Sequence, residues 1–338
     1  MPVDLWSSTP FVDEARAWVA DSCRPLGITL TGEWEQPHCR PWSSAIRFAS
    51  DSGQLWFKVN GPGTRHEASL VATLGRLAPG LAPDVLAVDA ERGWSLTRDA
   101  GPLLRTEAGP DELWPHWEAL VARYAEAQIA LVPHRDELLA TGIRELSPRT
   151  CPVVVRELFE ELEALPEDQG GLGAEQAAAV TARLPRYDEW CAELAASGVP
   201  DSIQHDDLHS ANVCWPLRDG KGGDVREARI IDWGDASHGS PLGTMLATLN
   251  SVAYHAGLFS DEGTFDDRRV WRVRDAYLEP FTAFAARADL VRYVDLVRRT
   301  GCLTRALSYQ AALREEPLSA HAELGFPVRD WFLGITEG

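Results

Sequence analysis

Apolar and polar residues alternate with different periods in the first third of the chain. Residues 10–23 repeat apolar side chains every three to four positions, which predicts an amphipathic helix. The segments Ile28–Glu35, Ser44–Ala49 and Gln54–Val59 follow the two-residue period of β-strands instead. A short polar turn makes the last two strands a predicted hairpin, whereas Gln36–Ser43 is expected to be a polar loop.

A lysine in the third predicted strand and a glutamate soon after it suggest an ion pair. Lys58 is flanked by Phe57 and Val59, so its side chain points to the opposite face of the strand. Taken alone, this pattern also fits the solvated face of an edge strand. Residues 66–77 then show a helical period, and Glu67 lies in the first turn. In kinases, a strand lysine paired with a helix glutamate contacts the ATP phosphates.

The pattern changes from strands to helices near residue 99. Val85–Val88 and Trp94–Thr97 predict two more strands, and Asp99–Pro102 has the composition of a linker. We therefore expect a β-rich lobe with an N-terminal helix at 1–98 and a helical lobe at 99–338. Helical periods predict helices at Asp111–Leu131, Val153–Leu165, Ala174–Ser197 (interrupted at Pro185), Leu242–Ala256, Asp266–Ala286, Leu290–Leu313 and Leu318–Leu324.

The side chains best suited to catalysis lie between Ser202 and Ala236. Two short segments, Ser202–Gln204 and Arg229–Ile231, predict strands. The polar, Gly-rich segment Arg218–Arg226 is typical of a hairpin turn, which would join two antiparallel strands near Val213–Trp215 and Ala228–Ile231. The polar residues that follow the two predicted strands are His205, Asp206, Asp207, His209 and Asn212 after the first, and Asp232 and Asp235 after the second.

The spacing of these residues favours a phosphoryl-transfer site. Asp207 and Asn212 are five positions apart, which in a kinase catalytic loop lets the carboxylate face a hydroxyl while the amide oxygen binds magnesium. The predicted hairpin brings Asn212 beside Asp232, which supplies a charged metal ligand. A single Asp after a strand is commonly a turn former or a helix cap, so the prediction rests on Asp207, Asn212 and Asp232 together.

A second interpretation is a metal-dependent hydrolase. His205, Asp206, Asp207 and His209 combine the imidazole and carboxylate groups that suit a transition metal. That interpretation leaves Lys58, Glu67 and Asn212 without a role.

Composition narrows the classes of partner. The 338 residues are 45% apolar and 25% charged, as in globular proteins, and carry a net charge of −19. This acidity argues against binding to nucleic acid or to an anionic membrane surface. It is explained by solubility, or by an acidic cleft that attracts a cationic substrate. Without a visible signal peptide or a long apolar run, we expect a cytoplasmic protein.

The two motifs resemble those of the aminoglycoside phosphotransferase family, small-molecule kinases with a protein-kinase-like fold. The family pattern H-G-D-x-x-x-x-N corresponds to His205–Asn212, and I-D-[WFH]-[EG]-x-A corresponds to Ile231–Ala236. The resemblance extends from about residue 28 to residue 307. It implies a bilobal α+β fold, with a small antiparallel-sheet N-lobe and a large, mainly helical C-lobe.

The resemblance also implies a role for individual residues. Asp207 would orient or deprotonate the acceptor hydroxyl, and Asn212 and Asp232 would hold Mg²⁺. Lys58, oriented by Glu67, would contact the α- and β-phosphates of ATP. The remaining implied roles are structural support of the catalytic loop by His205, a phosphate-covering loop that includes Ser43 and Ser44, and contacts to the adenine edge from the Arg98 carbonyl and the Ala100 amide.

Two positions depart from the family pattern. Asp206 stands where the family usually has Gly, a residue that often marks a backbone with positive φ. Because Asp tolerates the left-handed region better than most residues, we expect distortion and not loss of the loop. Thr244 replaces an Asp of the following helix, which would loosen support of the catalytic loop.

We therefore expect an enzyme that transfers the γ-phosphate of ATP, with Mg²⁺, to a hydroxyl of a small molecule. The acceptor is an aminoglycoside, a sugar, an amino alcohol or a nucleoside-like compound. The alternatives are a nucleotide-binding pseudokinase and the metal-dependent hydrolase. Further candidates for acceptor binding, all of types common on helix surfaces, are His134, Glu157, Glu160, His209, Asp235, Tyr254, His255 and Glu279.

Overall fold

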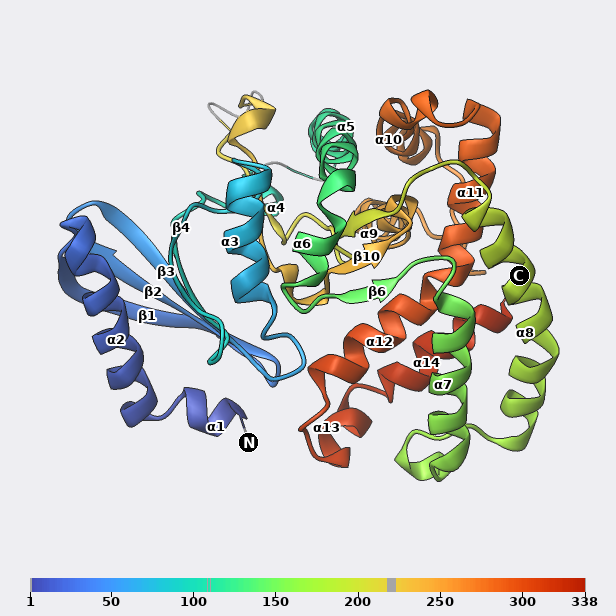
Figure 1. The fold of residues 1–338 in the computed structure, drawn as a ribbon, viewed down its shortest axis with the longest axis horizontal. Coiled ribbons are helices and arrows are strands. Elements are labelled where there is room, and N and C mark those ends of the chain that lie inside the picture. Colours follow the sequence, from blue (N-terminus) through green and yellow to red (C-terminus); the bar gives the residue numbers. More distant parts are fainter. Residues whose placement is uncertain (1, 108, 110, 218–222, 338) are drawn as a thin grey trace.

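The computed structural model describes residues 2–107, 109, 111–217 and 223–337. A β-sheet with flanking helices lies at one end of the molecule, and helices form most of the remainder (Figure 1). Part of the predicted hairpin turn, residues 218–222, lies outside the described residues.

The N-terminal sheet is antiparallel, with the strand order β1-β2-β3-β5-β4. Every predicted strand of this region is present. The strands are β1 (Leu30–Cys39), β2 (Ser43–Ser50), β3 (Gly53–Asn60), β4 (Val85–Asp89) and β5 (Trp94–Arg98).

The expected polar loop at Gln36–Ser43 was wrong, because strand β1 continues through its first half, to Cys39, and β2 begins at Ser43. Pro37 lacks an N–H group, but β1 pairs with β2 alone and its register shifts between Glu35 and His38. An edge strand with such an irregularity accommodates a proline. The turn between the strands is therefore short, and the Arg40 N–H donates to the Ser43 carbonyl at 2.8 Å.

Helix α2 (Thr9–Cys23) covers one face of the sheet (Figure 1). Its Phe11 and Val19 are buried with Phe57 of β3 and Trp94 of β5. Each such side chain contributes about 1.5–3 kcal/mol when fully buried. Because side chains alternate along a strand, packing Phe57 against α2 turns Lys58 to the opposite face. A short helix that the sequence pattern did not predict, α1 (Pro2–Trp6), precedes α2.

Helix α3 (Glu67–Leu77) connects the sheet with the helical region. It lies beside β4 and between the sheet and the helices in Figure 1. Its Leu70 and Leu74 are buried in the same apolar cluster as Trp117 and Tyr124 of the helical region. The N-terminal end of α3, where Glu67 lies, is thereby fixed relative to both parts.

The helical region contains helices close to most of those predicted. Their bounds are α4 (Leu104–Glu107), α5 (Trp114–Leu131), α6 (Arg135–Leu139), α7 (Cys151–Ala164), α8 (Ala174–Ala195), α9 (Thr244–His255), α10 (Arg268–Leu278), α11 (Arg287–Thr300), α12 (Cys302–Ala312), α13 (Leu318–Glu323) and α14 (Pro327–Leu333). No described helix has both the length and the apolar character needed to cross a membrane.

Three predicted helices differ from the structure. Leu290–Leu313 is not one helix, because α11 and α12 are separated at Gly301, where a Cβ would stand 2.7 Å from the Val297 carbonyl oxygen. Asp266–Ala286 ends as a helix at Leu278, just before Pro280. Helix α8 continues through Pro185, since the carbonyl that loses its partner belongs to the exposed residue Thr181 and remains open to water.

Short strands in the helical region position the central motif. Strand β7 (Ser202–Gln204) pairs antiparallel with β10 (Ser237–Gly239), which also pairs with β6 (Arg144–Leu146). Strand β8 (Val213–Cys214) pairs antiparallel with β9 (Arg229–Ile230), as predicted. The polar residues that follow β7 and β9 are consequently brought together.

Candidate active site

Lys58 of β3 holds two carboxylates that come from different parts of the chain. Its Nζ lies 2.7 Å from Glu67 Oε2 and 2.5 Å from Asp232 Oδ1. Glu67 is buried, and its Oε1 also accepts the Trp233 N–H at 3.1 Å. The side-chain amide of Asn60 donates to the other carboxylate oxygen of Glu67. Glu67 therefore fixes both the lysine and the segment that carries Asp232.

The charges of this cluster stabilise one another. Burial alone would lower the pKa of Lys58, but Asp232 and Glu67 outweigh it and raise that pKa above its ordinary value. Burial likewise favours protonation of Asp232, but Lys58 holds its pKa below the usual range. The lysine is thus a fixed cation, and Asp232 is an ionised carboxylate.

His205 supports the loop that follows β7. Its ring is fully buried, and Nε2 donates to the Ile231 carbonyl at 2.8 Å, while Nδ1 accepts the Asp207 N–H at 3.3 Å. The ring also contacts Trp233, with centroids 4.8 Å apart. Burial lowers the pKa of His205, in keeping with a neutral ring that links the two motif strands.

Asp206, which replaces the usual glycine, adopts the left-handed conformation with φ of 62°. Its buried carboxylate accepts the Ser237 hydroxyl at 2.5 Å. Burial raises the pKa of Asp206 to about 7, against the lowering effects of Ser237 and Arg305. Asp206 thus adopts the positive φ that a glycine at this position would indicate, with its side chain turned into the interior.

The catalytic loop has a further support that the motif comparison did not predict. Thr244 is buried and accepts a hydrogen bond from the Gln128 side chain at 3.3 Å. One turn later on α9, the Thr248 hydroxyl donates to the Leu208 carbonyl at 3.0 Å. Thr248 thus holds the backbone next to Asp207.

Asn212 and Asp232 present the donor set that a hard cation requires. The Ile231 N–H donates to the Asn212 carbonyl at 2.9 Å, which joins the two motifs. The Asn212 side-chain nitrogen donates to the Asp207 carbonyl at 3.0 Å, so its Oδ1 is left to accept a metal ion. One amide oxygen and one carboxylate suit Mg²⁺, and the residues therefore fit this ion.

Arg305 of α12 brings together the carboxylates that face the remaining side of the site. Its Nη1 donates to Asp235 Oδ2 at 2.8 Å and to the Asp206 carbonyl at 3.0 Å. Its Nη2 lies 3.4 Å from Asp207 Oδ1. The Arg305 side chain is only 11% exposed. Two carboxylates from the motif region are therefore tied to one guanidinium from a late helix.

Arg305 and His209 also control the ionisation of Asp207. Burial would raise the pKa of Asp207, but Arg305 and then His209, whose Nε2 lies 3.4 Å from Asp207 Oδ2, lower it below the ordinary range. Asp235 differs, because burial outweighs Arg305 and raises its pKa to about 6. Asp207 is therefore an ionised carboxylate that can accept hydrogen bonds.

These groups open into one cavity of about 110 Å³. Glu67, Asp207, Asp232, Asp235 and Arg305 contribute its charged groups. The volume is below the roughly 300–1,000 Å³ of most small-molecule sites. The β3–α3 loop narrows it, since a Cβ on Gly63 would stand 2.0 Å from the Ala311 carbonyl oxygen of α12.

The remaining residues predicted to bind nucleotide occupy different surroundings. Ser43 lines the cavity, whereas the buried Ser44 hydroxyl donates to the His38 carbonyl at 3.0 Å and accepts from Gln36. Arg98 ends β5 and is exposed, and Ala100 follows in the linker. Neither of the last two lines this cavity as it is described.

The further acceptor candidates separate into two groups. Asp235 lines the cavity, and His209 contacts Asp207. The others lie on helix surfaces away from the described cavity lining. Glu157 and Glu160 are exposed on α7, Tyr254 and His255 are exposed on α9, His134 pairs with Glu137, and Glu279 pairs with Arg287.

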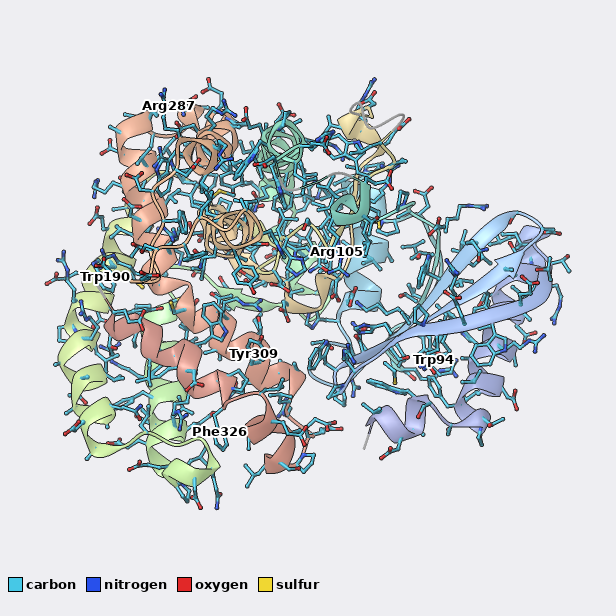
Figure 2. The ribbon with its side chains drawn as sticks, turned by 180° about the vertical axis from the view of Figure 1, so that it is seen from behind. Trp94, Arg105, Trp190, Arg287, Tyr309 and Phe326 are labelled. Atoms are coloured by element: carbon cyan, nitrogen blue, oxygen red, sulfur yellow. The ribbon has the colours of Figure 1, made fainter. Side chains whose placement is uncertain are left out.

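Several cavity residues were missed by the sequence analysis. Trp42 lies in the β1–β2 turn, and Arg305, Ser308 and Tyr309 lie on α12. The three α12 residues recur at helical spacing on one face, which was the available signal, but polar residues at that spacing usually mark a solvated face. Tyr309 lies between the sheet and helices α7 and α8 in Figure 2.

Comparison with known proteins identifies related structures. A macrolide 2′-phosphotransferase from Brachybacterium faecium shares 16% identity and a TM-score of 0.56, covering 93% of this chain and 97% of that one. A choline/ethanolamine kinase family protein from Mesorhizobium loti shares 20% identity and a TM-score of 0.55, covering 97% and 99%. An aminoglycoside phosphotransferase from Streptomyces rimosus shares 18% identity and a TM-score of 0.50, covering 86% and 98%. No curated protein matches the chain.

The comparisons confirm the predicted fold and family. The structural matches extend over nearly the whole chain and establish the bilobal, kinase-like α+β fold. The model of the phosphotransferase enzyme family (APH) matches residues 64–243, more than half of the 338 residues. This range contains Glu67, the catalytic loop and Asp232. The protein therefore belongs to the APH phosphotransferase enzyme family and is a phosphotransferase that acts on hydroxyl groups.

Proposed function

We propose that this enzyme transfers the γ-phosphate of ATP, in the presence of Mg²⁺, to a hydroxyl group of a small molecule. The observation that carries the proposal is the convergence of Asp207, Asp232 and Glu67 on one cavity, with the Lys58 ammonium bound to the last two. We also propose that residues 1–98 form the nucleotide-binding lobe and residues 99–338 the lobe that carries the catalytic loop and the acceptor site.

Lys58 and Glu67 act on the nucleotide. Lys58 is a partly buried cation that Glu67 holds in place at 2.7 Å, so it binds the α- and β-phosphates without losing much side-chain freedom on binding. The β1–β2 turn with Ser43 covers the phosphates, and the backbone at Arg98 and Ala100 contacts the adenine edge. Ser44 supports the turn through its bond to the His38 carbonyl.

Asp207 acts on the acceptor. Because Arg305 and His209 keep its carboxylate ionised, Asp207 accepts a hydrogen bond from the acceptor hydroxyl and orients its oxygen toward the γ-phosphorus. As the new O–P bond forms, the bond from the γ-phosphorus to the β–γ bridging oxygen breaks, ADP leaves, and Asp207 receives the hydroxyl proton. His205 keeps the Asp207 backbone in place through Nδ1. Asp235 and His209 border the position of the acceptor.

Asn212 and Asp232 would hold Mg²⁺ through the amide oxygen and the carboxylate. When bound, this ion neutralises the charge of the phosphate oxygens. The two residues are joined through the Ile231–Asn212 backbone hydrogen bond, so their spacing does not depend on the ion.

The acceptor is a small molecule that carries several polar groups. The related structures are named for macrolides, for choline or ethanolamine and for aminoglycosides. Asp207 and Asp235 favour hydroxyl and amine groups on the acceptor, while Arg305 offsets part of their charge. We therefore propose a hydroxylated amine or a polyol.

The structure does not favour the hydrolase interpretation. Its four proposed ligands do not converge: His205 uses Nε2 for the Ile231 carbonyl, and the Asp206 carboxylate faces Ser237. Within the described residues, no group of three or more His, Cys, Asp or Glu side chains is arranged to hold a metal ion.

An ATP-consumption screen tests the proposal. The panel contains aminoglycosides, amino sugars, sugars, choline-like alcohols, macrolides and nucleosides, with mass spectrometry of the phosphorylated product. Asp207→Asn is expected to abolish turnover while calorimetry still detects binding of ATP and Mg²⁺. Asp136→Asn is the matched control, because that side chain is 93% exposed. Nucleotide binding without turnover of any acceptor would favour the pseudokinase, and no nucleotide binding would refute both interpretations.

A further inference from the structure

A second and larger cavity lies among α7, α12, α13 and α14, close together in the lower part of Figure 1. Its volume is about 430 Å³, within the range of roughly 300–1,000 Å³ that small-molecule sites occupy. Helix α12 separates it from the catalytic cavity. Tyr309 and Ala312 face the catalytic side, whereas Gln310 and Leu313 face the second cavity.

Leucines make part of the cavity lining apolar. Leu162 and Leu313 are buried members of this lining. Leu165 and Leu318, which also line it, are 42% and 48% exposed. Exposed leucines that converge on one cavity leave apolar surface in water, which the apolar part of a ligand would cover.

The charge of the lining opposes the charge of the whole protein. Three arginines and one glutamate line the cavity, while the chain carries a net charge of −19. In the described part of the chain, neither Arg144 nor Arg314 forms an ion pair with a carboxylate. Arg144 and Arg314 are both exposed. Partial desolvation and then the neighbouring Arg314 lower the pKa of Arg144, against the effect of Glu161. The two guanidinium groups thus repel each other beside a cavity whose lining is partly apolar.

The wall that faces these arginines is held in a strained conformation. Phe326, labelled in Figure 2, has φ of 54°, which is unusual for an aromatic residue. A Cβ on Gly170 would stand 2.7 Å from the Phe326 ring, so glycine at position 170 leaves room for that ring. Arg329 lies over the ring at 5.2 Å. Backbone strain that the surroundings maintain is found preferentially at ligand sites.

We propose that this cavity binds an amphipathic organic anion, with its carboxylate or phosphate group between Arg144 and Arg314 and its apolar body against Leu162, Leu313 and Phe326. An anion there relieves the repulsion between the two guanidinium groups and accepts bidentate hydrogen bonds from them. This site is distinct from the proposed ATP and acceptor site, and its occupancy is measured without nucleotide.

Competition against the fluorescent anion 8-anilinonaphthalene-1-sulfonate tests the proposal. The competitors are octyl phosphate, octanoate, octanol and inorganic phosphate. Octyl phosphate and octanoate are expected to displace the probe at concentrations about ten-fold lower than octanol, because a charge-assisted hydrogen bond is lost with the alcohol. Displacement by octanol at the same concentration would refute the anion site. Displacement by inorganic phosphate at the same concentration as octyl phosphate would refute the claim that the apolar body of the ligand contributes to binding.

Variants locate the site. Arg314→Met is expected to weaken octyl phosphate about ten-fold and to leave octanol unchanged. Arg186→Met is the matched control, since Arg186 is exposed on α8, pairs with Glu189 and lies outside the cavity. Glu161→Gln, which removes the opposing charge, is expected to tighten octyl phosphate several-fold. Circular dichroism verifies that each variant folds. Unchanged octyl phosphate affinity in folded Arg314→Met and Glu161→Gln would overturn the proposal.

Discussion

Replacing Arg305 with methionine tests how the catalytic loop is held. Methionine keeps an unbranched apolar stem but removes the guanidinium, and with it the bonds to Asp235 at 2.8 Å, to the Asp206 carbonyl at 3.0 Å and to Asp207 at 3.4 Å. Two carboxylates and one carbonyl then lose a cationic partner at once. We expect a loss of stability that depends on pH and a loss of activity that does not depend on nucleotide affinity.

The size of the stability loss follows from burial. Removing one partner of a fully buried ion pair costs about 3–5 kcal/mol. Here Arg305 is 11% exposed, but Asp235 and Asp207 are 22% and 30% exposed, so water replaces part of the interaction. We therefore expect the free energy of unfolding to fall by about 2–3 kcal/mol at pH 8.

The loss becomes smaller at low pH. The pKa of Asp235 is raised to about 6 by burial although Arg305 opposes the rise, and the unfolded value is near 4. Without Arg305 the folded pKa rises further. At pH 5, Asp235 is mostly protonated in both folded proteins, so the difference shrinks to what the bond to the Asp206 carbonyl and the contact with Asp207, which stays ionised, contribute. Above pH 6, Asp235 ionises in the wild type and Arg305 stabilises it.

Urea unfolding at pH 5 and pH 8 measures this difference directly. Arg298→Met is the matched control, because Arg298 is a partly buried arginine that bonds to Asn250 and, within the described residues, to no carboxylate. Its loss of stability is expected to be similar at both pH values. An equal loss for Arg305→Met at pH 5 and pH 8 would show that the Asp235 contact does not stabilise the fold.

Activity provides the second measurement on the same variant. If Arg305 holds Asp207 in its orientation, kcat is expected to fall by about 10–100-fold while the KM for ATP stays within about two-fold. A comparable loss of ATP affinity would mean that Arg305 acts through the nucleotide site instead.

Three further substitutions test other parts of the site. Lys58→Met leaves Glu67 without its cation, so we expect kcat/KM for ATP to fall at least 100-fold, as read by ATP consumption. Asp206→Gly removes the buried carboxyl, whose folded pKa of about 7 exceeds its unfolded value. Wild-type stability therefore falls as pH rises from about 4 to 7, so thermal melts should show the variant gaining up to about 4 kcal/mol relative to wild type over that range. Gly63→Ala places a Cβ 2.0 Å from the Ala311 oxygen, and we expect its melting temperature to fall while that of Gly75→Ala, with open space, does not.

Local periodicity was enough to predict the five strands, α2 and α3 of the N-terminal lobe, though not α1 or the extension of β1. Alternation in β3 assigned Phe57 and Lys58 to opposite faces, and the structure buries Phe57 against α2 with Lys58 toward Glu67. The strands and α3 are set by contacts between nearby residues, so their pattern is visible in short windows of sequence. The antiparallel pairing of β8 with β9, which joins the two motifs, was predicted from nearby sequence in the same way.

Arg305 was not predictable in this way. It lies about a hundred residues after Asp206, to which it donates, and nothing local distinguishes it from an exposed helix arginine. Its direction depends on the break at Gly301, where close contacts with the Val297 carbonyl and Leu246 require a glycine. A continuous Leu290–Leu313 helix would have continued the direction of α11 and placed Arg305 elsewhere. The role of Arg305 depends on tertiary contacts with Asp206 and Asp235, which a helical pattern in the sequence does not reveal.

Asp206, where the sequence departs from the family motif, is also a residue that Arg305 contacts. A glycine at φ of 62° would be relaxed, whereas an aspartate there carries backbone strain and a buried carboxyl. Both features have partners in this chain: Ser237 donates to the carboxylate, and Arg305 donates to the Asp206 carbonyl as well as to Asp235. Arg305 thus binds the backbone at the position where the motif is unusual and the carboxylate of Asp207 one residue later. Glycine at position 206 should therefore make the loop less dependent on Ser237 but leave its dependence on Arg305 intact. The double variant Asp206→Gly/Arg305→Met should accordingly lose as much activity as Arg305→Met alone.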